Sequence, residues 1–107
     1  MQTEKYFALS LLLDIYGTLL TQKQREALEM YLNEDLSLSE IAENTGISRQ
    51  AAQDSIKKAE QRLQEWEMVL GICRKRQQIE AVLQQMQTKE DSAEAGIEQI
   101  RKILWEE

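Results

Sequence analysis

The chain contains no proline, and only four glycines occur along its 107 residues. Proline and glycine disfavour helix interiors more than any other residues, so long stretches of this chain meet no helix breaker. The good helix formers Leu, Glu, Gln, Ala and Lys dominate the remainder, whereas the β-branched and aromatic residues that favour strands are few. The sequence therefore predicts an all-α protein.

The length, charge and hydropathy limit the possible partners. The net charge is −6, whereas proteins that bind DNA over much of their surface are usually basic, so any contact with nucleic acid must come from a local patch. The apolar run Phe7 to Leu13 is too short to span a bilayer, and no signal peptide pattern precedes it. We expect a soluble, cytoplasmic protein without membrane insertion.

The residue type that most often acts as a general base is missing. The chain has no histidine, the commonest general base and metal ligand. Its one cysteine, Cys73, cannot form an intramolecular disulfide and is expected to be a buried, inert thiol. Neither a glycine-rich phosphate loop nor a metal-ligand spacing occurs. These features predict a non-enzymatic protein that uses no metal or other cofactor.

Apolar spacing and capping residues divide the chain into helices. A first helix is expected to end near Gly17 or Leu19. Its predicted apolar face consists of Leu9, Leu12, Leu13, Tyr16, Leu19 and Leu20. Two capping boxes, Thr21 with Gln24 and Ser37 with Glu40, predict a second helix from Gln22 to about Asn33 and a short third helix before Gly46. Ser48 is expected to cap a fourth helix, and Asp91 or Ser92 to begin the last one.

The segment from Leu38 to Ala59 has the spacing of a helix-turn-helix. Ala42 is small where two helices must approach closely, and Gly46, four residues later, can take the positive φ of a tight turn. Ile47 is the expected apolar plug after the turn. The small core between the helices is expected to contain Ile41, Ala52 and Ile56. The alternative is an ordinary helical hairpin in which these residues are only core.

The second helix of such a motif enters the major groove of DNA by its N-terminal residues. The residues expected to contact nucleic acid are therefore Ser48, Arg49, Gln50, Gln53 and Lys57. Arg49 suits guanine, the two glutamines suit adenine, and the start of the helix at Ser48 suits a phosphate. The alternative is that the charged members of this set are ordinary solvated surface.

The remainder of the chain has a different pattern. From Ile56 to Cys73, apolar residues follow the three-and-four spacing of a heptad seam for about two and a half repeats. We predict a helix-turn-helix domain over 1–64 and a helical, heptad-like extension over 65–107, which packs on that domain or on a partner subunit in a homodimer. The helix either continues through Gly71 or hinges there.

Several segments resemble the YlxM family of small bacterial helix-turn-helix proteins. They are Asp14 to Gln24, Tyr31, Asp35 to Glu43 and, as the most specific part, Gly46 to Ala51. The family is similar in turn to the promoter-binding region 4 of sigma factors, so the resemblance implies a helix-turn-helix without a winged element. It also implies a regulatory role near the signal recognition particle, through its GTPase Ffh or its RNA. Ala52 and Gln53 stand where the family pattern has a larger apolar residue and an aromatic one.

Two functions remain open from the sequence. The first is a regulatory protein that binds double-stranded DNA through the residues from Ser48 to Lys57. The second is an interaction module for Ffh or its RNA that binds no DNA and presents acidic surface to a basic partner. The charges support both functions. Ser48 to Leu63 contains four basic and two acidic residues, which suits contact with phosphates. Ala27 to Glu43 contains five acids and no base, which suits a basic partner.

Overall fold

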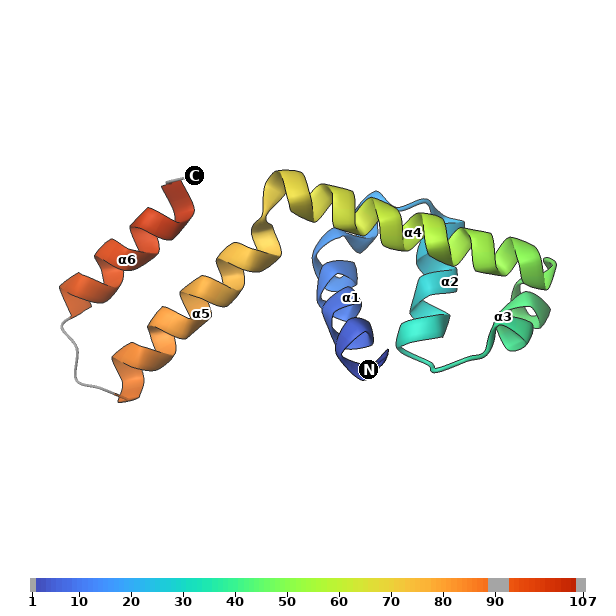
Figure 1. Cartoon of the computed structure of the whole chain (residues 1–107), viewed down its shortest axis with the longest axis horizontal. Coiled ribbons are helices and arrows are strands. Elements are labelled where there is room, and N and C mark those ends of the chain that lie inside the picture. The colour runs from blue at the N-terminus through green and yellow to red at the C-terminus, as the bar shows by residue number, and fades with distance from the viewer. Residues whose placement is uncertain (1, 89–92, 106–107) are drawn as a thin grey trace. The chain divides into compact units, whose positions relative to one another are not determined.

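The computed structural model describes residues 2–88 and 93–105, and every regular element in those ranges is helical (Figure 1). The all-α prediction is thus confirmed. The chain divides into two compact units, one ending at Leu70 and the other beginning at Gly71. The first unit contains α1 (Gln2–Tyr16), the 3-10 helix η1 (Gly17–Leu19), α2 (Gln22–Leu32), α3 (Leu38–Thr45) and α4 (Arg49–Leu70), and the second contains α5 (Ile72–Thr88) and α6 (Ala93–Trp105).

The first unit is built on α4, against which α1, α2 and α3 all pack (Figure 1). One side of α4 is buried along its length because apolar residues recur there at the spacing of a helix face: Ala52, Ile56, Ala59 and Leu63. The other helices contribute Leu9, Leu12, Leu13, Tyr16, Leu20, Ala27, Leu28 and Ile41. Burying one such leucine or isoleucine contributes roughly 1.5–3 kcal/mol, so this core is the main source of the unit's stability.

Hydrogen bonds between side chains also join the first helix to its neighbours. The hydroxyl oxygens of Tyr6 and of Tyr31 in α2 are hydrogen-bonded over 2.6 Å, and the two ring centroids are 5.2 Å apart. This bond and partial burial raise the pKa of Tyr31 to about 12. The buried Tyr16 hydroxyl donates to Oε1 of Glu67 in α4 over 2.7 Å. The orientation of α1 is therefore fixed by polar contacts at both of its ends.

Both predicted capping boxes are present. The Thr21 hydroxyl accepts from the Gln24 backbone N–H over 3.2 Å, and the Gln24 side chain accepts from the Thr21 N–H over 3.3 Å. Ser37 and Glu40 make the same reciprocal pair at 3.1 and 3.0 Å. These bonds satisfy backbone donors that a helix start otherwise leaves unpaired, so α2 and α3 begin where the sequence predicts.

The prediction that Leu19 belongs to the apolar face of the first helix is wrong. Leu19 is 58% exposed, because the α-helix ends at Tyr16 and the next three residues form the tighter η1. The change from 3.6 to 3.0 residues per turn moves Leu19 off the buried face, while the extended backbone at Leu20 returns that side chain to the core.

The sequence leaves open whether the helix continues through Gly71 or breaks there. It breaks, because α4 ends at the residue before this glycine. The glycine has φ +63°, a left-handed conformation that only glycine adopts readily, and α5 begins at the next residue. The predicted domain boundary between Gln64 and Glu65 falls inside α4, and the division of the chain lies at Gly71 instead. Within α4 the predicted seam remains buried through Leu63, whereas Leu70 is 46% exposed.

The second unit is a hairpin in which α5 packs against α6. Gly96 is buried at this contact, and a methyl group added to it would clash with the side chain of Met86. The helices approach closely there because glycine has no side chain. Cys73 is buried, as predicted. The expected start of the last helix at Asp91 or Ser92 lies outside the described residues.

Candidate nucleic-acid interface

The turn between α3 and α4 has the backbone conformation that a helix-turn-helix requires. Gly46 has φ +72°, and its N–H donates to the Ala42 carbonyl over 2.9 Å. The Ile47 N–H donates to the same carbonyl over 3.1 Å, so both bonds close the end of α3. Ile41, Ala52 and Ile56 are buried, as the motif predicts. The turn therefore holds the beginning of α4 at a fixed angle to α3.

The predicted plug after the turn is less buried than expected. Ile47 is 36% exposed and lines a hollow of about 480 Å³ between α2, α3 and α4. The small side chains Ala27 and Ala51 face this hollow, which is why no neighbour covers the isoleucine completely. Lys23 of α2 lies at the same hollow.

Ser48 caps α4, as predicted. Its hydroxyl accepts from the Ala51 N–H over 3.0 Å, and its carbonyl accepts from the Ala52 N–H over 3.0 Å. The first backbone N–H groups of a helix carry a partial positive charge, which gives this end of α4 an affinity for anions. The serine is exposed, so the helix start is open to a ligand.

The remaining predicted residues follow Ser48 along α4. Arg49, Gln50 and Lys57 are exposed, whereas Gln53 is half-buried. No acidic side chain pairs with Arg49 or Lys57 within the described parts of the chain. The amide of Gln50 donates to Oδ1 of Asp54, one turn later, over 3.1 Å. The two cations are thus free for an external anion, and Gln50 would have to leave Asp54 to contact a base.

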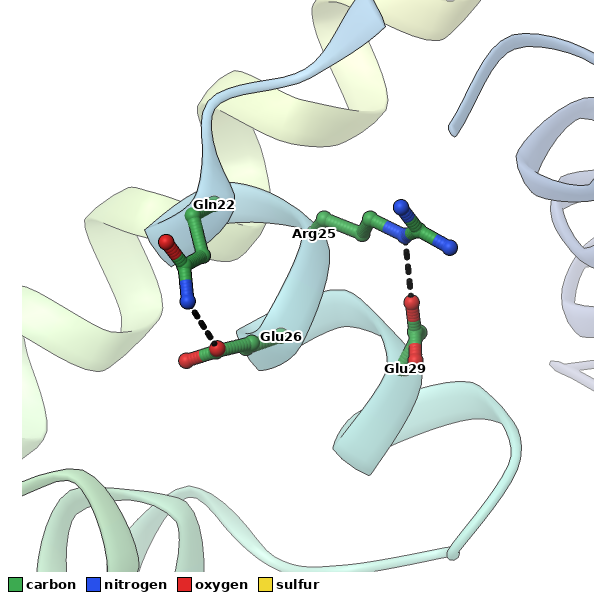
Figure 2. Close-up of polar contacts among 4 residues, drawn as sticks. All are labelled: Gln22, Arg25, Glu26 and Glu29. Atoms are coloured by element: carbon green, nitrogen blue, oxygen red, sulfur yellow. Dashed lines mark hydrogen bonds and ion pairs between the residues drawn. The ribbon is translucent and has the colours of Figure 1, made fainter. Parts of the chain in front are cut away.

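The acidic segment beside this helix is partly neutralised within α2 (Figure 2). The Nε atom of Arg25 lies 2.8 Å from Oε1 of Glu29, one turn apart, and the Gln22 amide donates to Glu26 over 2.9 Å. In α3, hydrogen bonds from Ser37 lower the pKa of Glu40 and hold it at the helix start. The exposed acids without such roles are Glu34, Asp35 and Glu43.

Two features of this surface are missing from the predictions made from the sequence. Arg25 lies just before the acidic segment that begins at Ala27, and it pairs with Glu29. The spacing of four residues along a helix is the sequence signal that could have suggested this pair. Lys23 lines the same hollow as Ala51 and Ser55 of α4, a position that no local motif reveals. No group of three or more His, Cys, Asp or Glu residues in the described ranges could hold a metal ion.

Comparisons with known proteins agree with this arrangement. Residues 3–103 match the model of the family UPF0122, described as "Putative helix-turn-helix protein, YlxM / p13 like". A UPF0122 protein of Clostridium kluyveri is 51% identical over 77 residues, covering 72% of this chain and 69% of that protein. One from Thermoanaerobacter sp. is 42% identical, covering 92% and 79%, and one from Bacillus mycoides is 41% identical, covering 94% of each chain. None of the helices in the described ranges is long and apolar enough to cross a membrane.

Proposed function

The chain belongs to the UPF0122 family of YlxM/p13-like helix-turn-helix proteins, and on this basis we propose that it is a cytoplasmic regulatory protein that binds double-stranded DNA. The observation that carries the proposal is the start of α4. There Arg49 is exposed shortly after a left-handed turn that orients the helix, and Lys57, about two turns further along α4, is exposed as well; neither is paired with an acid within the described residues. Exposed cations near the start of a capped helix suit insertion into a major groove, where they can reach base edges and phosphates.

Each residue has a distinct role in this proposal. Arg49, the first residue of the helix, donates to O6 and N7 of a guanine, and Gln53 contacts the neighbouring base. Gln50 contacts an adenine after its amide leaves Asp54. The exposed start of the helix at Ser48 and the Lys57 ammonium bind phosphates and set the register of the helix on the duplex.

The test selects duplexes from a random-sequence library with the full chain and then measures the affinity of an enriched duplex by fluorescence anisotropy. Replacing Arg49 with glutamate should weaken binding at least about tenfold, because one bidentate contact is worth roughly 1–3 kcal/mol and the new charge repels phosphate. The matched control is Arg62→Glu, the same charge reversal at an exposed residue further along α4. Equal affinity of the Arg49→Glu and Arg62→Glu proteins would refute the assignment of the reading helix.

The acidic surface favours a second candidate, an interaction module for the signal recognition particle GTPase Ffh or its RNA that works without DNA. Glu34, Asp35 and Glu43 are exposed, and none of them is used as a helix cap or in an ion pair with Arg25. Such a surface suits a partner with a basic face. Under this candidate, Glu34→Lys combined with Glu43→Lys should abolish capture of purified Ffh, while Arg49→Glu should leave capture intact. If Arg49→Glu instead abolishes binding to an enriched duplex and the combined Glu34→Lys and Glu43→Lys variant retains it, the result supports DNA binding.

A homodimer belongs to the first proposal. A two-fold DNA site presents two half-sites about one helical turn apart, and a dimer would supply one copy of α4 to each. Dimerisation would also add stability to a chain of only 107 residues.

A further inference from the structure

The α5–α6 hairpin leaves one apolar face uncovered. Leu83 is 40% exposed, Ile97 is 52% exposed and Leu104 is 44% exposed. We call these three residues the outer stripe. They lie apart from the contact between α5 and α6, where Gly96 is buried against Met86 and where Ile100 and Ile103 are half-buried. Two helices packed on each other bury only one side of each, and a unit shorter than about 40 residues rarely has a sufficient core of its own.

The hairpin also has unlike charges at its two ends. The first turns of α5 contain Arg74, Lys75 and Arg76, whereas the first turns of α6 contain Glu94 and Glu98. The contact between Met86 and Gly96 shows that the helices are antiparallel, with the start of α6 beside the end of α5. The basic cluster and the acidic pair therefore lie toward opposite ends of the hairpin.

Charge and apolar residues share one side of each helix. Arg76 precedes Leu83 by seven residues, and Glu94 precedes Ile97 by three, so each pair lies on one helix face. Ile97 and Leu104 are likewise seven residues apart. The outer stripe is thus flanked by a cation at one end and by an anion at the other.

We propose that the outer stripe is covered by the same face of a second copy, with the two hairpins antiparallel in a four-helix bundle. This two-fold arrangement places Arg76 of one copy near Glu94 of the other, twice, whereas a parallel arrangement would bring like charges together. The face is about 25 Å long, from the 1.5 Å rise of a helix, and two helices or roughly 20 Å wide. An area of this order is near the lower limit for a stable dimer of standard size. The proposal deepens the homodimer of the proposed function, and because its tests contain no DNA, they can fail without refuting DNA binding.

The first test is sedimentation equilibrium of the full chain without DNA, at roughly 100 µM, where a micromolar dissociation constant gives mostly dimer. Ile97→Glu should raise the dimer dissociation constant at least about tenfold, because it buries a carboxylate in the apolar face. The matched control is Gln85→Glu, which adds the same charge at an exposed position on the opposite side of α5 from Leu83. Helicity by circular dichroism checks that both variants remain folded. A monomeric wild-type chain, or a dimer equally sensitive to both substitutions, would overturn the proposal.

The second test separates the antiparallel arrangement from every other one. Arg76→Glu and Glu94→Arg should each weaken the dimer, because each creates two like-charge pairs. Mixing the two variants restores both opposite-charge pairs, so native mass spectrometry should find more heterodimer than either homodimer. A statistical mixture of the three species, or an Arg76→Glu protein that dimerises more tightly than the wild type, would exclude the antiparallel arrangement.

Discussion

Replacing Gly46 with alanine tests whether the turn of the helix-turn-helix depends on backbone conformation alone. A Cβ atom built on Gly46 meets no atom within 4 Å, so alanine would not clash with any neighbour. The backbone there has φ +72°, however, and a left-handed conformation costs an L-residue with a Cβ atom about 1–2 kcal/mol. The Gly46→Ala protein should therefore lose about 1–2 kcal/mol of unfolding free energy. Gly46→Asn should lose less, because asparagine tolerates this region better.

The assay is urea unfolding followed by tryptophan fluorescence. Trp66 reports on the first unit, since its ring centroid lies 6.4 Å from that of the buried Tyr16. Trp105 belongs to the second unit and is 79% exposed, so a Trp105→Phe background removes its signal at little cost. An alanine variant as stable as the glycine protein would show that the turn does not hold φ positive. Equal losses for alanine and asparagine would show that the effect does not arise from the left-handed backbone.

Three further predictions follow from single contacts. Ser37→Ala should cost about 1 kcal/mol of unfolding free energy in the same urea assay, because it removes the cap of α3. Gly96→Ala, which makes the flexible side chain of Met86 move, should stabilise the hairpin against heat by less than the roughly 1 kcal/mol that alanine gains over glycine in a helix; the full gain would contradict the close approach. Tyr31 should ionise near pH 12 when followed by tyrosinate absorbance, and Tyr6→Phe should lower this value toward 10. Because the raised pKa favours the neutral phenol in the folded state, its contribution to stability is present below pH 10 and lost as the pH rises through 12.

What the sequence predicts correctly is local. The capping boxes at Thr21 and Ser37 and the turn at Gly46 depend on residues within four positions of one another, so their geometry follows from the helix itself. The exposure of Arg49 and Lys57 also follows from helical spacing, because the apolar residues of α4 occupy a single face.

What the sequence does not predict depends on packing between distant segments. Leu19 and Ile47 look like core residues, yet one lies in a 3-10 turn and the other beside a hollow left by small side chains. Hydrophobicity alone cannot report the space that neighbours fill. The position of Lys23 at a hollow shared with α4 likewise requires the α2–α4 contact. The functional role of the predicted DNA-binding residues is a property of a complex, and for this reason it stays a prediction.

The salt dependence of DNA binding links the proposed DNA contacts of α4 to the proposed self-association of the α5–α6 hairpin. In the proposed complex, the exposed Lys57 ammonium of α4 binds a phosphate, whereas the exposed Arg49 donates to a guanine. Each phosphate neutralised changes the logarithm of the binding constant by about −0.9 per logarithm of salt concentration, so the Lys57 contact gives a slope near −1 for one copy. If the hairpins hold two copies on one DNA site, the slope should approach twice that value. Ile97→Glu should then halve the slope of the wild-type protein while leaving every DNA-contacting residue in place. An unchanged slope in a monomeric Ile97→Glu protein would mean that only one copy contacts the DNA.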